Sequence, residues 1–271
     1  MNEEIIQSRK DFEKLGNNYP KASGVIIEKQ IIENIDCYWF KIPGKTNYSK
    51  LAVYLHGGCF VLGSVRSHQS LVSHLAKNLE LPIVFVEYSL APEKPYPNAV
   101  NDIFTVYRQL GTHYPQSNFI LIGDSAGGWL SMALLSRICK SGLKLPKYNI
   151  MISPWIDLTC SNKSITENSR IDHILNKNRL KEFASLYITN LDLAIVKPVE
   201  NISNFPSTLI LVGSREILLD DSKELYNKIK MLQPQIKLCI YENQTHVWLL
   251  DTIDSEPSQN AIKEMKIFLI H

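Results

Sequence analysis

The hexapeptide Gly123-Asp124-Ser125-Ala126-Gly127-Gly128 has the residue types and the spacing of a nucleophile turn. It follows the apolar run 119–122 and precedes a helix-like stretch, so a strand, a sharp turn and a helix are predicted in that order. Such a turn exposes the serine hydroxyl at the strand tip, and its glycines prevent a clash between strand and helix. The free N–H groups that open the helix favour a negative charge there. Ser125 is therefore predicted to be the nucleophile of a hydrolytic reaction.

A second segment, His56-Gly57-Gly58-Cys59-Phe60, is suited to stabilising the oxyanion that a serine attack creates. It directly follows the predicted buried strand 51–55. Small residues let backbone N–H groups approach a tetrahedral oxyanion from the side opposite the nucleophile turn. The expected oxyanion-hole donors are the N–H groups of Gly57, Gly58, Cys59 and Ala126.

Four segments resemble motifs of the hormone-sensitive-lipase-like family of α/β-hydrolases, a group of carboxylesterases. They occur in the family's order and at similar spacing, and they are His56–Phe60, Glu87–Glu93, Gly123–Gly128 and Ser153–Leu158. The resemblance implies an α/β-hydrolase fold: a mostly parallel central sheet with helices on both faces. It also implies a Ser–acid–His triad, an esterase-type reaction on a small-molecule ester, and neither a cofactor nor a metal.

The triad of such a fold appears in the chain order serine, acid, histidine. The acid is expected after the predicted strand 207–212, where Glu216 and Asp220 match the family's two acidic positions. Glu216 is the predicted triad acid and Asp220 is the alternative. Asp221 has another interpretation, because with Glu224 it has the spacing of a helix N-cap and its capping-box partner.

The base is expected in the loop after the next strand, which is predicted at 236–241. His246 lies there and is followed two residues later by an aromatic residue, as in the family. His246 is therefore the predicted general base. The other histidines outside the oxyanion segment are expected on the surface; they are His68, His74, His113, His173 and His271.

Three positions depart from the family pattern: Cys59 replaces a third glycine, Ser89 replaces an arginine, and Glu216 replaces an aspartate. A glutamate can still orient the imidazole and stabilise its charged form. Cys59 is expected to adopt an ordinary backbone conformation, to keep its N–H as a donor and to narrow the acyl site. The alternative is that it is a small residue tolerated in a loop, without a role in substrate preference.

The periodicity predicts alternating strands and helices throughout the chain. An opening strand pair is predicted at 25–30 and 35–41. The further core strands are expected at 51–55, 83–88, 119–122, 150–153, 209–212 and 238–241, and the helices at 67–78, 98–110, 128–140, 177–188, 221–231 and 256–269.

The whole chain, 1–271, is predicted to form one domain with a small cover over its active site. Residues 1–24 are expected to supply a short cap of one helix, and the segment 160–200 a partial lid. Because this cover is small, we expect a fairly open pocket that prefers short acyl chains. Its expected apolar walls are Phe60, Leu62, Trp129, Trp155 and Trp248, and the four aromatic residues among them are the candidate substrate-binding residues.

Composition narrows the range of partners. The net charge of +2 is too balanced to argue for a nucleic acid or a membrane surface. No apolar run approaches the roughly 20 residues of a membrane span, and the first residues have no apolar signal core. Five scattered cysteines without metal spacing favour reduced thiols and a cytoplasmic location. The sequence leaves a homodimer open.

Two other functions are compatible with these motifs. Arylformamidases share the His-Gly-Gly loop and a similar serine turn, so an amide or formamide could be the substrate. A hydrolase fold can also serve as a ligand-binding module, although such proteins typically lose a triad member.

Overall fold

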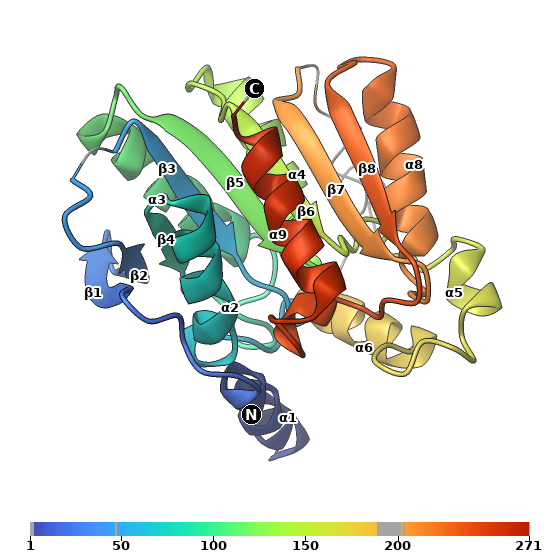
Figure 1. Ribbon diagram of the computed structural model, residues 1–271. Coiled ribbons are helices and arrows are strands. Elements are labelled where there is room, and N and C mark those ends of the chain that lie inside the picture. Colours follow the sequence, from blue (N-terminus) through green and yellow to red (C-terminus); the bar gives the residue numbers. More distant parts are fainter. Residues whose placement is uncertain (1–2, 47, 189–201, 203, 271) are drawn as a thin grey trace.

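The computed structural model describes residues 3–46, 48–188, 202 and 204–270. Within these residues eight strands form one sheet in the order β1-β2-β4-β3-β5-β6-β7-β8 (Figure 1). β2 is antiparallel to both of its neighbours, and all pairs from β4 to β8 are parallel. The strands are β1 (Ile26–Ile32), β2 (Ile35–Lys41), β3 (Lys50–Leu55), β4 (Ile83–Val86), β5 (Asn118–Asp124), β6 (Tyr148–Ile152), β7 (Ser207–Gly213) and β8 (Ile236–Tyr241).

The central strands are apolar on both faces because both faces are covered. Alternate residues of β3 enter different cores: Leu51 and Val53 face one cluster, whereas Ala52 and Tyr54 face the other. The opening hairpin turns at Glu33 and Asn34, which both have positive φ, as a two-residue connection between twisted strands requires.

Helices cover both faces of the sheet (Figure 1). Buried residues of α3 (Asn98–His113), α4 (Ala126–Ser141) and α8 (Leu219–Lys230) pack in one cluster. Those of α2 (Val65–Leu79) and α9 (Glu256–Phe268) pack in the other. This arrangement confirms the predicted α/β-hydrolase fold.

The segment that is expected to form the cap folds into α1 (Glu3–Glu13) and the 3-10 helix η1 (Lys14–Asn17), which lie with α6 (Lys177–Tyr187) at the lower end of Figure 1. Arg9 of α1 donates to the carbonyls of Val61 and Ala91, at 2.8 Å each, and pairs with Glu93. The other short helices among the described residues are α5 (Ser164–Glu167) and η3 (Trp248–Leu250). Part of the expected lid, 189–200, lies outside the described residues.

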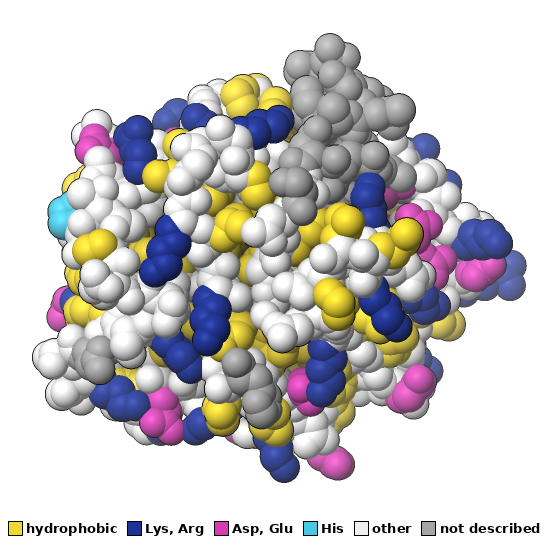
Figure 2. Space-filling view, turned by 90° about the horizontal axis from the view of Figure 1, so that it is seen from above, with side chains coloured by type: hydrophobic (Ala, Val, Ile, Leu, Met, Phe, Trp, Pro, Cys, Tyr) yellow, Lys and Arg dark blue, Asp and Glu magenta, His cyan; other side chains and the backbone are white. Residues whose placement is uncertain are grey.

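None of the described helices is long and apolar enough to span a membrane. Figure 2 shows the face of the molecule away from α1, where Lys and Arg side chains are dispersed among uncharged ones.

Candidate active site

Ser125 lies in a strained turn between β5 and α4. Its backbone has φ 51° and ψ −117°, outside the usual regions for a residue with a side chain. The turn fits only because its neighbours are glycines: a Cβ on Gly127 would lie 1.9 Å from the carbonyl oxygen of Leu55. The Ser125 N–H donates to the Ile152 carbonyl at 2.9 Å, which ties the turn to β6. The buried hydroxyl is thus held at the tip of the central strand.

The structure brings the three predicted triad residues into one hydrogen-bonded chain. His246 Nε2 lies 2.9 Å from Ser125 Oγ, and His246 Nδ1 lies 2.9 Å from Glu216 Oε2. They meet because Ser125, Glu216 and His246 follow the carboxyl ends of the parallel strands β5, β7 and β8. Burial by itself lowers the pKa of His246, but the hydrogen bond and charge of Glu216 outweigh it and raise that pKa above its usual value.

The rival acids have other partners. Asp220 accepts from the Ser164 N–H at 2.9 Å and pairs with Lys223. The capping-box interpretation of Asp221 was wrong, since the cap position of α8 is Leu218 and carries no side-chain bond. Instead, buried Asp221 accepts from the N–H groups of Ile156 and Asp157, at 2.7 and 2.9 Å.

The oxyanion segment follows β3 and lies beside Ser125. The N–H of Gly57 donates to Asp124 Oδ1 at 3.0 Å, so Gly57 is removed from the expected donors. No described residue accepts a hydrogen bond from the N–H groups of Gly58, Cys59 and Ala126. The ordinary backbone conformation expected for Cys59 was wrong, because its backbone is left-handed (φ 55°), as is that of Phe60 (φ 65°).

A buried polar network around Asp124 supports the oxyanion segment. Asp124 Oδ1 also accepts from the Tyr54 hydroxyl at 2.8 Å, and Asp124 Oδ2 lies 3.4 Å from His68 Nε2. The surface expectation for His68 was therefore wrong, since its side chain is fully buried. His56 stacks on Tyr88, with ring centroids 4.1 Å apart, and burial lowers the pKa of His56 to about 3, which keeps the ring neutral.

A cavity of about 450 Å³ opens onto Ser125 and His246. Its walls come from the cap, the oxyanion segment, the residues before and within α6, and the turn after His246. The lining residues are Ser8, Asp11, Phe12, Leu15, Gly58, Cys59, Leu62, Asp124, Ser125, Ile174, Leu175, Asn176, Arg179, Leu180, Phe183, His246, Val247, Leu250 and Asp251. The cavity lining is therefore mostly apolar, and its Asp and Arg residues are Asp11, Asp124, Arg179 and Asp251.

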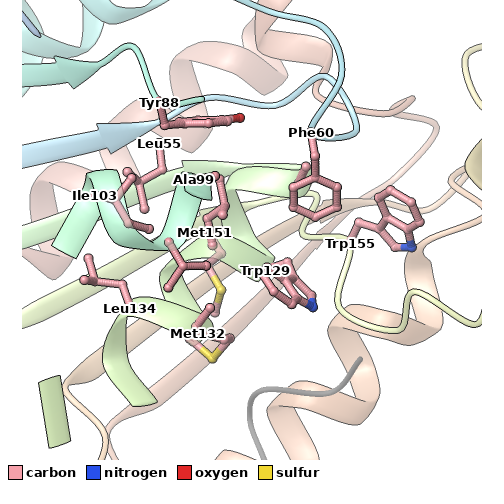
Figure 3. Packing of buried hydrophobic residues seen from close by; sticks show 14 of the residues in the cluster. Leu55, Phe60, Tyr88, Ala99, Ile103, Trp129, Met132, Leu134, Met151 and Trp155 are labelled. Atoms are coloured by element: carbon pink, nitrogen blue, oxygen red, sulfur yellow. The ribbon is translucent and has the colours of Figure 1, made fainter. Parts of the chain in front are cut away.

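The four aromatic residues expected to bind substrate are not among the cavity-lining residues. Phe60, Trp129 and Trp155 pack together in the core (Figure 3), where the Phe60 ring also stacks on Tyr187 at 4.0 Å. Trp248 packs on Tyr241 on the other side of the sheet, and all four side chains are almost fully buried. Large rings gain more from mutual burial than from lining a hydrated cavity.

The sequence reasoning missed the apolar residues that the cap and α6 contribute. Phe12 and Leu15 are three residues apart, as are Leu180 and Phe183. Leu180 and Phe183 share one face of α6, so their spacing was a usable signal. Among the described residues, no group of three or more His, Cys, Asp or Glu side chains is placed to hold a metal ion.

Comparison with known proteins agrees with this geometry. Residues 52–250 match the family described by the alpha/beta hydrolase fold. An esterase of Acinetobacter venetianus is 33% identical over 213 residues, which cover 77% of this chain and 69% of that protein. An acetyl-hydrolase of Streptomyces hygroscopicus is 33% identical over 200 residues, or 72% of this chain and 67% of that protein.

Among solved structures, an esterase from the bacterial hormone-sensitive lipase family superposes with a TM-score of 0.93 at 31% identity. The match covers 98% of this chain and 90% of that one. The chain therefore belongs to the hormone-sensitive-lipase-like family of α/β-hydrolases.

Proposed function

We propose that this hydrolase is a serine carboxylesterase that cleaves short-chain acyl esters through an acyl-enzyme. The observation that carries the proposal is the continuous chain from Ser125 through His246 to Glu216 at the base of an apolar cavity. The names of two relatives, an esterase and an acetyl-hydrolase, support the ester as substrate.

In the proposed reaction His246 Nε2 takes the Ser125 proton as Oγ attacks the ester carbonyl carbon. The oxyanion accepts hydrogen bonds from the N–H groups of Gly58, Cys59 and Ala126. Glu216 stabilises the imidazolium at Nδ1, and the imidazolium then protonates the departing alcohol. A water molecule, deprotonated by His246, attacks the acyl-enzyme and releases the acid.

Short acyl chains are favoured because the Cys59 side chain lines the cavity where the family usually has a glycine. The apolar walls from the cap and α6 suit an uncharged acyl group.

The test is hydrolysis of p-nitrophenyl esters of increasing acyl length by the wild type, Ser125→Ala and Ser131→Ala. Ser131 is a matched control, because it is a buried serine of α4, the helix that follows Ser125, and does not line the cavity. We expect turnover to fall with acyl length, to survive in Ser131→Ala and to drop by about 10⁶ in Ser125→Ala, as in subtilisin. Ester hydrolysis by Ser125→Ala would refute the mechanism. If the wild type hydrolyses an N-formyl aryl amine but no ester, the substrate class is a formamide and not an ester.

A further inference from the structure

Ser153 occupies an unusual position directly after β6. Its side chain is fully buried and its φ is 49°, a left-handed conformation that is uncommon for any residue except glycine. The Ser153 N–H donates to the Leu211 carbonyl of β7 at 2.7 Å, which holds the backbone in this state. Strained residues of this kind persist where the surrounding structure imposes them, and they cluster at functional sites.

The Ser153 hydroxyl joins the loop that carries the acid to the loop that carries the base. Its Oγ donates to Glu216 Oε1 at 2.6 Å and accepts from the N–H of Val247 at 3.1 Å. Val247 directly follows His246, and its own φ of 46° is a marked outlier for a β-branched residue. One buried hydroxyl thus contacts the triad acid and restrains the strained residue next to the triad base.

The acid in this chain needs such a restraint. Glutamate has one more rotatable bond than aspartate, so its carboxylate can turn away from the imidazole more easily. Glu216 Oε2 must face His246 Nδ1, while Oε1 is held by Ser153 Oγ and by the N–H of Gly213, at 2.6 Å each. Gly213 is the last residue of β7, the strand that leads into the loop of Glu216. Of the two donors to Oε1, only Ser153 also binds the loop of His246.

We propose that Ser153 is a positioning residue that sets the orientation of the Glu216 carboxylate toward His246. The proposal rests on the proposed function, because it assigns Ser153 a role only through the triad.

The first test compares Ser153→Ala and Ser153→Gly in folded, full-length protein. Both remove the hydroxyl, but glycine tolerates the left-handed backbone, so Ser153→Gly is expected to be the more stable of the two. We expect kcat to fall by about 10- to 100-fold in both, the range seen for groups that orient metal-ligating side chains, with KM unchanged. The two variants would then have similarly low kcat, because both lack the hydroxyl. Their melting temperatures would differ, because only glycine relieves the backbone strain.

Ser164→Ala is the matched control. Ser164 is a buried serine whose hydroxyl donates to the Ile217 carbonyl in the same acid loop, at 2.7 Å, but does not contact the Glu216 carboxylate. This variant is expected to lose stability while its kcat stays near the wild-type value.

The second test is a double-mutant cycle with Glu216→Gln. If Ser153 acts by orienting the carboxylate, Ser153→Gly should cost at most about threefold in the Glu216→Gln background, far less than in the wild type. An equal loss in both backgrounds, or a kcat within twofold of wild type in both single variants, would overturn the proposal. Failure of the triad itself would appear separately, as ester hydrolysis that survives Ser125→Ala.

Discussion

Glu216 is one methylene longer than the aspartate usual in its family, yet its carboxylate reaches His246 Nδ1 at 2.9 Å. The backbone absorbs the difference through close packing at the start of the acid loop. A Cβ on Gly213 would lie 2.3 Å from the Gln244 carbonyl oxygen and 3.0 Å from Glu216 Oε1. The small residue therefore lets the longer acid fold back against its own strand.

Glu216→Gln should lower kcat by about 10⁴-fold, as for the corresponding change in chymotrypsin-like triads. The acid limb of the kcat/KM profile should report His246, which acts only when neutral. Because the Glu216 charge raises the pKa of His246, the wild-type limb should lie above pH 6.5, and it should move to lower pH in the variant. Asp220→Asn is the control, and its kcat and the pH of its acid limb should equal those of the wild type. If Asp220→Asn instead lowers kcat and shifts the limb while Glu216→Gln does neither, Asp220 is the triad acid.

Cys59→Gly should relieve left-handed strain and enlarge the cavity. The expected result is unchanged or higher stability and a shift of acyl preference toward longer chains, measured by thermal unfolding and an ester series. Cys160→Gly is a matched control, since Cys160 is also buried and left-handed (φ 52°) but does not line the cavity. If both variants keep the wild-type acyl profile, Cys59 does not narrow the site.

At the scale of elements, the cavity is closed by two helices far apart in the sequence. Arg179 of α6 donates to Glu4 at 2.9 Å and to Ser8 at 3.0 Å, and so links α6 to α1. Its guanidinium also packs over the Phe183 ring at 4.4 Å. Phe183 and Phe12 both line the cavity, so this link keeps two apolar walls in place.

Arg179→Met keeps the aliphatic stem and removes the link. We expect KM to rise by about 3- to 10-fold with kcat nearly unchanged, because substrate must then order the walls. Stability should change by less than about 1 kcal/mol, as for exposed ion pairs. Arg66→Met is the control, since Arg66 pairs with Glu13 of α1 at 3.5 Å but lies outside the cavity. An equal rise in KM in both variants would argue against the link.

For the molecule as a whole, the aromatic residues that line the cavity differ from the buried aromatic residues that do not reach it. The core set, Phe60, Trp129 and Trp155, packs together in the interior (Figure 3). The cavity set, Phe12 and Phe183, comes from α1 and α6. Stability and substrate preference should therefore respond to different substitutions.

Trp129→Ala should cost about 3–5 kcal/mol of unfolding free energy, as for other buried aromatic truncations. Its acyl preference should stay that of the wild type while the protein remains folded. Phe12→Ala should do the opposite, with a smaller loss of stability, because Phe12 is only partly buried, and a changed acyl-length profile. Denaturant unfolding and the ester series measure both effects, and a changed profile in Trp129→Ala alone would refute the division.

The sequence by itself determined the local features of this protein. The turn around Ser125 is set by adjacent glycines, and the strands and helices by short-range periodicity, so each was predicted close to its observed position. Chain order predicted that His246 and Glu216 would lie near Ser125, because loops at the carboxyl ends of neighbouring parallel strands must converge. Hydrogen bonds join the three side chains in the structure.

Only the tertiary structure decided which side chains meet across long separations. Local spacing made Asp221 a helix cap, but two backbone N–H groups more than 60 residues away bind its carboxylate instead. His68 is buried because it packs beside Asp124, and the expected aromatic walls are core residues because the cap helices supply the cavity. These outcomes depend on burial and on partners that a local pattern does not contain.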